Sequence, residues 1–145
     1  MAAYGLYAAK FRFSKIIYLL LISPMIIPVV LIGIGIFYAY AKLRLVNTIT
    51  GLVLAHAILA LPLVLIVVTS ALHSFDQNLE IAARSLGASR LRAFFSVTLP
   101  QIRFSVITAA LLSFLTSFDE VIVALFISGG KNGTVTRRMF TSLRD

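Results

Sequence analysis

Three long runs of apolar residues constrain this chain more than any other feature of its sequence. They cover residues 16–40, 48–70 and 104–127. Each run exceeds the roughly 20 residues that an α-helix needs to cross the hydrocarbon core of a bilayer. In lipid, backbone groups must be paired within the segment, so such runs form helices. We therefore predict an all-α, polytopic integral membrane protein with three long transmembrane helices.

The overall composition supports a membrane location. The chain is 60% hydrophobic and 12% charged, and its mean hydropathy is +1.02, whereas about a quarter of a soluble domain is charged. The net charge of +8 comes from short basic segments that flank the apolar runs, as in loops that face anionic lipid. We therefore do not expect nucleic-acid binding.

Metal sites are not expected. The chain has no cysteine, which excludes disulfides and Cys-based metal sites. The two histidines, His56 and His73, lie too far apart in the sequence to indicate a shared metal. No nucleophile–base arrangement and no nucleotide-binding motif is present, so we predict neither an enzyme nor a bound cofactor.

The first apolar run has the flanks of a membrane span. Residues 10–15 alternate basic and aromatic side chains, which is typical of an anchor at the membrane interface. Pro24 and Pro28 lie inside the run, where neighbouring helices can satisfy the carbonyl groups that a proline leaves unpaired. Tyr38 and Tyr40 close the run and predict an aromatic belt.

Ionisable side chains inside the runs are the candidates for a substrate pathway: Asp119, Glu120 and His56. Each ionised carboxylate near the middle of a bilayer costs about 2.5–3.5 kcal/mol on insertion scales. Neighbouring helix positions lie about 100° apart, so we predict that one acid lines the pathway and the other pairs with a neighbouring helix. Alternatively, both acids form structural pairs, or the span begins after them. For His56, which should bond a neighbouring helix, we consider a packing role and a ligand role.

The segment 74–103 separates the second and third runs and is the longest segment with many polar residues. An apolar stripe at helical spacing predicts a short first helix and consists of Leu79, Ala82, Ala83 and Leu86. Ser74 or Asp76 can cap the start of this helix, and Gly87 ends it. Ser89 can cap a second short helix, which Pro100 limits. We predict a helix–turn–helix loop.

The spacing within this loop resembles the EAA loop of ABC importer inner-membrane permeases. That loop reads Glu-Ala-Ala, three residues, Gly, nine residues, Ile, one residue, Leu-Pro. The residues that carry the resemblance are Ala82, Ala83, Gly87, Val97, Leu99 and Pro100. Val97 replaces the isoleucine conservatively, and Ile81 stands where the motif has its glutamate. Glu80, one position earlier, is the candidate for the polar contact of that glutamate.

The resemblance implies an architecture and a set of partners. Residues 1–145 would form a single, partial permease domain that matches the third to fifth spans of a six-span fold. The loop would be cytoplasmic and would bind a separate ABC ATPase subunit, which binds the ATP. A second permease subunit and a periplasmic or lipoprotein substrate-binding protein would complete a transporter in the bacterial inner membrane. The basic residues, seven on one side and six on the other, do not orient the chain by themselves.

A narrower resemblance concerns the solute. Residues 117–121 and 125–129 resemble the spermidine/putrescine branch of these permeases, and an acidic pair suits a cation through Coulomb attraction. Branches for opines, iron or oxyanions share the scaffold and remain alternatives. Two further alternatives are a multi-span scaffold that transports nothing, and an intramembrane enzyme that uses Asp119 and His56.

Overall fold

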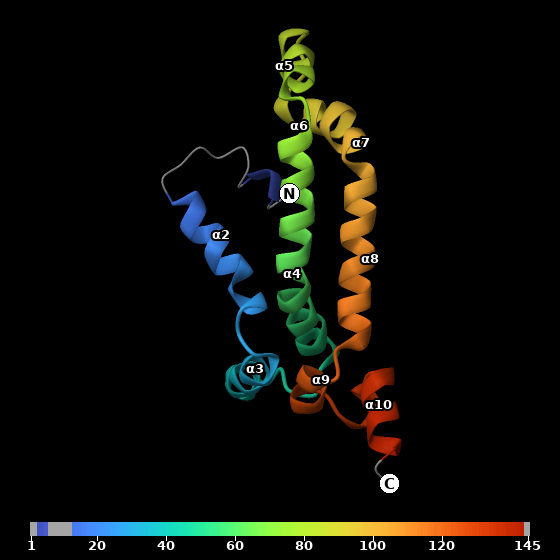
Figure 1. Ribbon diagram of the computed structural model, residues 1–145. Helices are drawn as coiled ribbons and strands as arrows, with labels where there is room; N and C mark the ends of the chain where they lie inside the picture. The colour runs from blue at the N-terminus through green and yellow to red at the C-terminus, as the bar shows by residue number, and fades with distance from the viewer. Residues whose placement is uncertain (1–2, 6–12, 144–145) are drawn as a thin grey trace.

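A computed structural model describes residues 3–5 and 13–143 of the chain, apart from the side chain of Lys131. The described residues form helices and turns without a strand, which confirms the predicted all-α class. Two long helices, α4 and α8, run side by side through the molecule (Figure 1). The 75–102 segment lies at one end of this pair, and α3, α9 and α10 lie at the other. Residues 10–12 of the predicted anchor lie outside the described residues.

The helices of the described residues are, in chain order, α2 (Ser14–Ile22), η1 (Ser23–Met25), α3 (Val29–Leu43), α4 (Ile49–Ser74), α5 (Gln77–Ser85), α6 (Arg90–Ala93), η2 (Phe94–Thr98), α7 (Leu99–Gln101), α8 (Arg103–Asp119), α9 (Ile122–Ile127), η3 (Gly130–Asn132) and α10 (Val135–Ser142). One of them, α4, is long and apolar enough to cross a membrane alone. Two bent pairs, Ser14–Met25 with Val29–Leu43 and Arg90–Gln101 with Arg103–Asp119, raise the number to three if each pair is one span.

The second apolar run folds as predicted into one helix, α4. Its N-cap is Thr48, whose Oγ1 accepts a hydrogen bond from the Gly51 N–H at 3.0 Å and donates one to the Leu45 carbonyl at 2.7 Å. A side chain at Gly51 would collide with that same carbonyl, so the tight entry to the helix requires glycine. Pro62 lies buried inside α4 without ending it.

The first apolar run is broken, whereas the sequence predicted that it continues. Its two halves, Ser14–Met25 and Val29–Leu43, meet at 104°. Pro28 occupies the N-cap of α3 with φ −54° and ψ 128°. Proline has no N–H for a helical bond and disfavours helical geometry in the residue before it, so the second helix starts afresh at this point.

The aromatic end of the first run is divided between two environments. Tyr38 is 67% exposed, as a side chain of a membrane belt would be. Tyr40 is 7% exposed and packs with Ala55, Val123 and Ile127 in a buried cluster. Tyr40 therefore belongs to the core that joins α3, α4 and α9, and the predicted belt does not include it.

The third apolar run also breaks, at its acidic pair. Helix α8 ends at Asp119, and Glu120 has the extended backbone angles φ −75° and ψ 104°. The Glu120 carboxylate accepts a hydrogen bond from the Val123 N–H at 2.8 Å, which satisfies a backbone donor at the start of α9. The predicted span 104–127 is therefore two helices, and the acids lie at the junction.

Helix α9 packs tightly against α3. A Cβ atom at Gly33 of α3 would lie 2.7 Å from a ring carbon of Phe126, so glycine permits the approach of the two helices. The Asn47 N–H donates to the Ile127 carbonyl at 2.7 Å, which ties the turn before α4 to the end of α9. This end of the molecule is held together by its own side chains.

Candidate functional site

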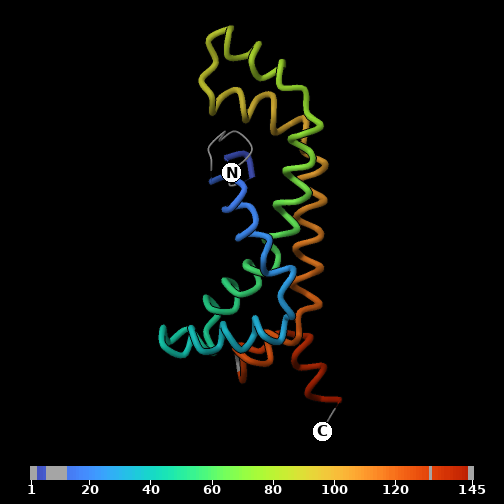
Figure 2. The backbone as a smooth tube through the Cα atoms, turned by 60° about the vertical axis from the view of Figure 1, so that its left-hand side comes forward, coloured from blue at the N-terminus to red at the C-terminus, as the bar shows by residue number. Residues whose placement is uncertain are grey.

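The segment between α4 and α8 forms a hairpin of short helices that folds back over the end of the long pair (Figure 2). We name residues 75–102 the coupling loop. Its first helix, α5, starts at Asp76, whose carboxylate accepts a hydrogen bond from the Asn78 N–H at 3.0 Å. Ser74 instead donates to the Ser70 carbonyl at 3.2 Å. Of the two predicted caps, Asp76 is therefore the one used.

The turn at Gly87 confirms the predicted end of α5. Gly87 has a φ of +92°, in the left-handed region that glycine enters at little cost. Its N–H donates to the Arg84 carbonyl at 3.0 Å, and the Ala88 N–H donates to the Ala83 carbonyl at 3.1 Å. This pair of bonds is a Schellman motif. The space beside Gly87 is open, so the constraint on this position is its backbone conformation.

The second half of the coupling loop is helical for longer than predicted. Ser89 caps α6 as expected, and its Oγ accepts from the Arg92 N–H at 3.3 Å. A π-helical turn, η2, then leads into α7, which contains Pro100. Proline at the start of a helix needs no N–H partner, so the chain stays helical through Gln101. The 75° bend into α8 follows at residue 102.

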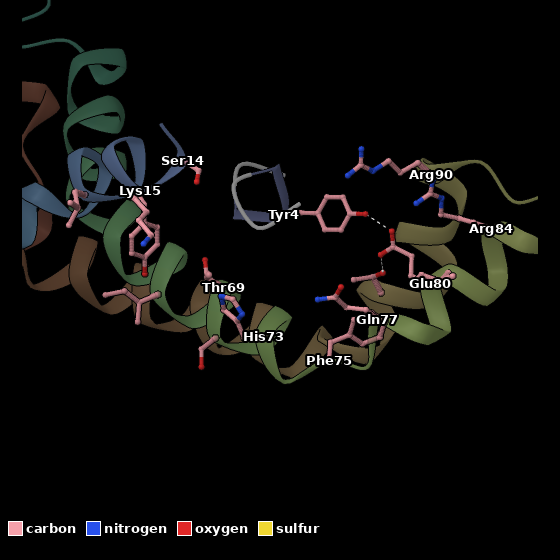
Figure 3. Close-up of a pocket in the computed structure, with 16 residues that line it drawn as sticks. Tyr4, Ser14, Lys15, Thr69, His73, Phe75, Gln77, Glu80, Arg84 and Arg90 are labelled. Atoms are coloured by element: carbon pink, nitrogen blue, oxygen red, sulfur yellow. Dashed lines mark hydrogen bonds between the residues drawn. The ribbon is translucent and has the colours of Figure 1, made fainter. Parts of the chain in front are cut away.

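Glu80 is the polar centre of the coupling loop. One carboxylate oxygen accepts a hydrogen bond from the Tyr4 hydroxyl and the other from the Thr98 hydroxyl, each at 2.6 Å. Thr98 is fully buried. Figure 3 shows the phenol of Tyr4 pointing at the carboxylate. Burial, and secondly the hydrogen bond to Glu80, raise the pKa of Tyr4 above its usual value, so the phenol remains a donor at neutral pH.

The motif residues take up distinct positions in the coupling loop. Ile81, which stands in place of the motif's glutamate, is 56% exposed. Ala83, Val97 and Leu99 are half-buried, whereas Ala82, Gly87 and Pro100 are exposed. Tyr4 and Thr98, the partners of Glu80, were not found from the sequence, because their contacts span 76 and 18 residues and no local pattern marks them.

The apolar stripe of α5 faces outward. Leu79 is 44% exposed, Leu86 is 90% exposed, and α5 buries no residue at all. The exposed side chains of Arg84, Arg90 and Arg92 add positive charge to the same loop. Clusters of exposed apolar side chains beside polar ones mark interaction surfaces. The coupling loop therefore presents an apolar and basic surface that the described residues leave uncovered.

A cavity of about 1020 Å³ lies between the coupling loop, α2 and α4. Its polar lining includes Tyr4, Lys15, Thr69, His73, Glu80 and Arg84 (Figure 3). Tyr4 and Glu80, which share a hydrogen bond, both line it, so residues 3–5 and the coupling loop each form part of its wall.

His56 joins the two long helices. Its side chain is buried, and its Nδ1 lies 2.8 Å from the Ser117 Oγ of α8. The predicted bond to a neighbouring helix is thus confirmed. Both residues line a second cavity, of about 580 Å³, together with Phe114 and Phe118. The other ring nitrogen, Nε2, is buried and has no hydrogen-bond partner among the described residues.

The two acids of the third run have different surroundings. Asp119 is exposed at the end of α8, and Glu120 is half-buried and bonds the backbone of α9. Neither is among the residues that line the cavity beside His56. Within the described part of the chain, no group of three His, Asp or Glu side chains is placed to hold a metal ion.

Comparisons with known proteins identify the kind of protein that this chain resembles. A family model described as "binding-protein-dependent transport system inner membrane component" matches residues 1–143. The putrescine transport system permease protein PotI of Escherichia coli is 30% identical over 141 residues, which are 93% of this chain and 50% of the relative.

Two further relatives cover the same region. The sulfoquinovosyl glycerol transport system permease protein SmoH of Agrobacterium fabrum is 32% identical, over 86% of this chain and 44% of the relative. The spermidine/putrescine transport system permease protein PotC of Haemophilus influenzae is 28% identical, over 99% of this chain and 56% of the relative. The chain thus spans about half the length of the curated relatives that it matches.

Proposed function

We propose, since this chain belongs to the family of binding-protein-dependent transport system inner membrane components, that it forms part of the permease subunit of an ATP-driven importer in the bacterial inner membrane. In this proposal the coupling loop binds a separate ATPase subunit and transmits the closure of that subunit to the membrane helices. The observation that carries the proposal is the outward-facing apolar stripe of α5 on a loop whose backbone is fixed at both helix ends.

The architecture of the coupling loop suits such a contact. The Asp76 cap and the Schellman motif at Gly87 fix both ends of α5, so little conformational freedom remains to be lost on binding. The small side chains of Ala82 and Ala83 let the helix lie deep in a groove of the partner. Leu86, at the tip, offers an apolar anchor for the centre of an interface.

The remaining partners follow from the same proposal. A periplasmic or lipoprotein substrate-binding protein delivers the solute to the outer face of this chain and a second permease subunit. ATP binds to the ATPase subunits, so this chain needs no cofactor and no catalytic residue of its own. Alternating access of the paired permease subunits then releases the solute on the cytoplasmic side.

A polyamine is our proposed solute. Two of the relatives are named as putrescine or spermidine/putrescine permeases, and the junction of α8 and α9 carries two adjacent acids. Glu120 is engaged by the backbone of α9 and Asp119 is exposed, so Asp119 is the better candidate to attract a cation. The relative named for sulfoquinovosyl glycerol favours a second candidate, an anionic solute on the same scaffold.

The test is co-purification of the full-length permease with its ATPase subunit. Gly87→Val should abolish the complex, because a β-branched residue is strained at a φ of +92°. Gly87→Asn is the matched control, since asparagine tolerates the left-handed region, and it should retain the complex. Ala83→Glu should weaken the complex by placing a large charged side chain in the contact. Undiminished binding in Gly87→Val and Ala83→Glu would leave the loop as a plain connector and favour a scaffold that transports nothing.

A further inference from the structure

Tyr4 contacts three residues of the coupling loop. Its hydroxyl donates to Glu80 at 2.6 Å. Its ring centre lies 4.6 Å from that of Phe94 at an angle of 57°, a tilted arrangement that aromatic pairs favour. The guanidinium of Arg90 lies 6.0 Å from the ring centre, at the outer limit of a cation–π contact. All three partners belong to the coupling loop, and Figure 3 shows Glu80 and Arg90 facing the phenol.

Glu80 extends this contact across the loop. Its second oxygen accepts from the Thr98 hydroxyl at 2.6 Å, and Thr98 is fully buried in the π-helical turn η2. Hydrogen bonds to a carboxylate are roughly twice as strong as those between neutral groups. Tyr4 is therefore connected to α5 and η2 at the same time, through a single side chain.

The hydrogen bonds of Glu80 are a main attachment of α5 to the rest of the described residues. Helix α5 has no fully buried residue, so apolar packing against the other described residues contributes little to holding its position. Its carboxylate at residue 80 instead bonds η2 and residues 3–5. When a partner displaces α5, these two hydrogen bonds are a direct route by which the movement reaches η2 and residues 3–5.

We propose that Tyr4, Glu80 and Thr98 form a clamp that makes residues 3–5 move with the coupling loop. In this proposal Tyr4 and Glu80 act through the position of α5 and are therefore positioning residues. The clamp rests on the proposed function for its role in transport. Its existence as a mechanical link does not depend on that function, so the two can be tested apart.

The mechanical link is tested with a nitroxide spin label at residue 5. This chain has no cysteine, and a Cβ atom at Gly5 would meet nothing within 4 Å, so Gly5→Cys offers an undisturbed attachment point. The full-length permease is studied in nanodiscs, with any cysteine outside this chain replaced by serine. Tyr4→Phe keeps the ring and removes the hydroxyl, and Glu80→Leu removes both acceptors. We expect each variant to raise the mobility of the nitroxide.

Two comparisons separate the clamp from general loosening. Tyr4→Phe in the Glu80→Leu background should raise the mobility no further, because its partner is already absent. Tyr38→Phe and Thr108→Val are matched controls, since both side chains are exposed and lie outside the coupling loop, and they should leave the spectrum unchanged. Unchanged mobility in Tyr4→Phe, or additive effects of Tyr4→Phe and Glu80→Leu, would overturn the clamp.

The role in transport is read from the ATP hydrolysed per solute imported. Losing one hydrogen bond weakens the link by about fivefold. We therefore expect the ATP hydrolysed per solute imported to rise by about fivefold in Tyr4→Phe and by more in Glu80→Leu. The affinity for the ATPase subunit should change by less than about twofold, because a hydrogen bond inside the loop contributes little to the affinity of a surface to which it does not belong. Glu80→Gln should restore most of the coupling, since its amide can still pair with both hydroxyls.

The two proposals fail in different ways. If the wild-type permease does not bind an ATPase subunit, the proposed function and the role in transport both fail, and the nitroxide result alone decides whether the link exists. If the wild type binds and transports, but Tyr4→Phe and Glu80→Leu import with normal coupling, the clamp has no role in transport and only the proposed function stands.

Discussion

Helices α5 and α9 are both short and lie at opposite ends of the α4–α8 pair (Figure 1). They differ in whether their apolar side chains are buried. Helix α9 buries Val123, Ala124 and Ile127 against α3 and α4. Helix α5 buries none, and its Leu86 is 90% exposed. The difference indicates that α9 stabilises this chain itself, whereas α5 provides a surface for another protein.

Each end also contains one glutamate that accepts hydrogen bonds, and these bonds differ in reach. Glu120 bonds a backbone N–H three residues further along, so it shapes a local corner. Glu80 bonds hydroxyls 76 and 18 residues away, so it ties together three parts of the chain. A change at Glu120 should therefore act on one helix, whereas a change at Glu80 should be felt across the coupling loop.

The largest effect is expected in the buried cluster of α9. Ile127→Ala should lower the free energy of unfolding by about 2–5 kcal/mol, because it opens a cavity beside Tyr40 and Val123. Thermal unfolding in detergent would measure this loss. Leu86→Ala is the control at the other end of the molecule and should change stability by less than about 0.5 kcal/mol, since the side chain is exposed. Equal losses would remove the distinction between the two helices.

The next effect concerns binding at the tip of the coupling loop. Leu86→Ser should weaken the complex with the ATPase subunit by about tenfold, as expected for an apolar side chain at the centre of an interface. Titration of the purified permease with labelled ATPase subunit would give this value. Leu43→Ser is a suitable comparison, because Leu43 is 66% exposed at the other end of the molecule. A similar loss from Leu43→Ser would argue against a specific contact at Leu86.

The two acids at the end of α8 should separate into a structural and a transport role. Glu120→Ala removes an acceptor for a backbone N–H of α9 and should cost about 1 kcal/mol of stability. Asp119→Asn should leave stability within about 0.5 kcal/mol, because Asp119 is exposed, and should slow the uptake of a labelled polyamine. Full polyamine uptake in Asp119→Asn would count against a cationic solute that is attracted by Asp119.

The smallest effect is expected between the two long helices. Ser117→Ala removes the partner of the His56 Nδ1, and a hydrogen bond between membrane helices contributes about 0.6 kcal/mol on average. Stability measured in detergent should fall by that amount, and ATPase binding should be unaffected. A loss as large as that of Ile127→Ala would mean that the His56–Ser117 contact stabilises the fold as much as the α9 cluster does.

The features that the sequence predicted well depend on chemistry within a few residues. The Asp76 and Ser89 caps and the turn at Gly87 each involve partners that are two to five residues away. Spacing and residue type therefore suffice to place them. The apolar runs likewise predict helices, because lipid leaves the backbone few alternatives.

The features that the sequence did not predict are of two kinds: helix breaks inside long runs, and contacts between residues that are far apart in the sequence. At Pro28 the chain bends sharply and a new helix starts. At Glu120 the helix α8 has ended, and the carboxylate bonds a backbone N–H of the following helix, α9. At Pro28 the sequence stays apolar on both sides, so hydropathy cannot detect the break, whereas the acidic pair at residues 119–120 marks the second break in the sequence without showing that the helix ends there. The Tyr4–Glu80 contact joins residues that are 76 positions apart, and only the folded chain brings them together.

The most direct test of the coupling loop is site-specific photo-crosslinking in the assembled transporter. A photoreactive maleimide is attached to Leu86→Cys at the loop tip, and to Leu43→Cys at the opposite end as the control. We predict that light produces an adduct with the ATPase subunit from residue 86 and not from residue 43. No adduct at residue 86, or equal adducts at both residues, would contradict the assignment of α5 as the surface that binds the ATPase.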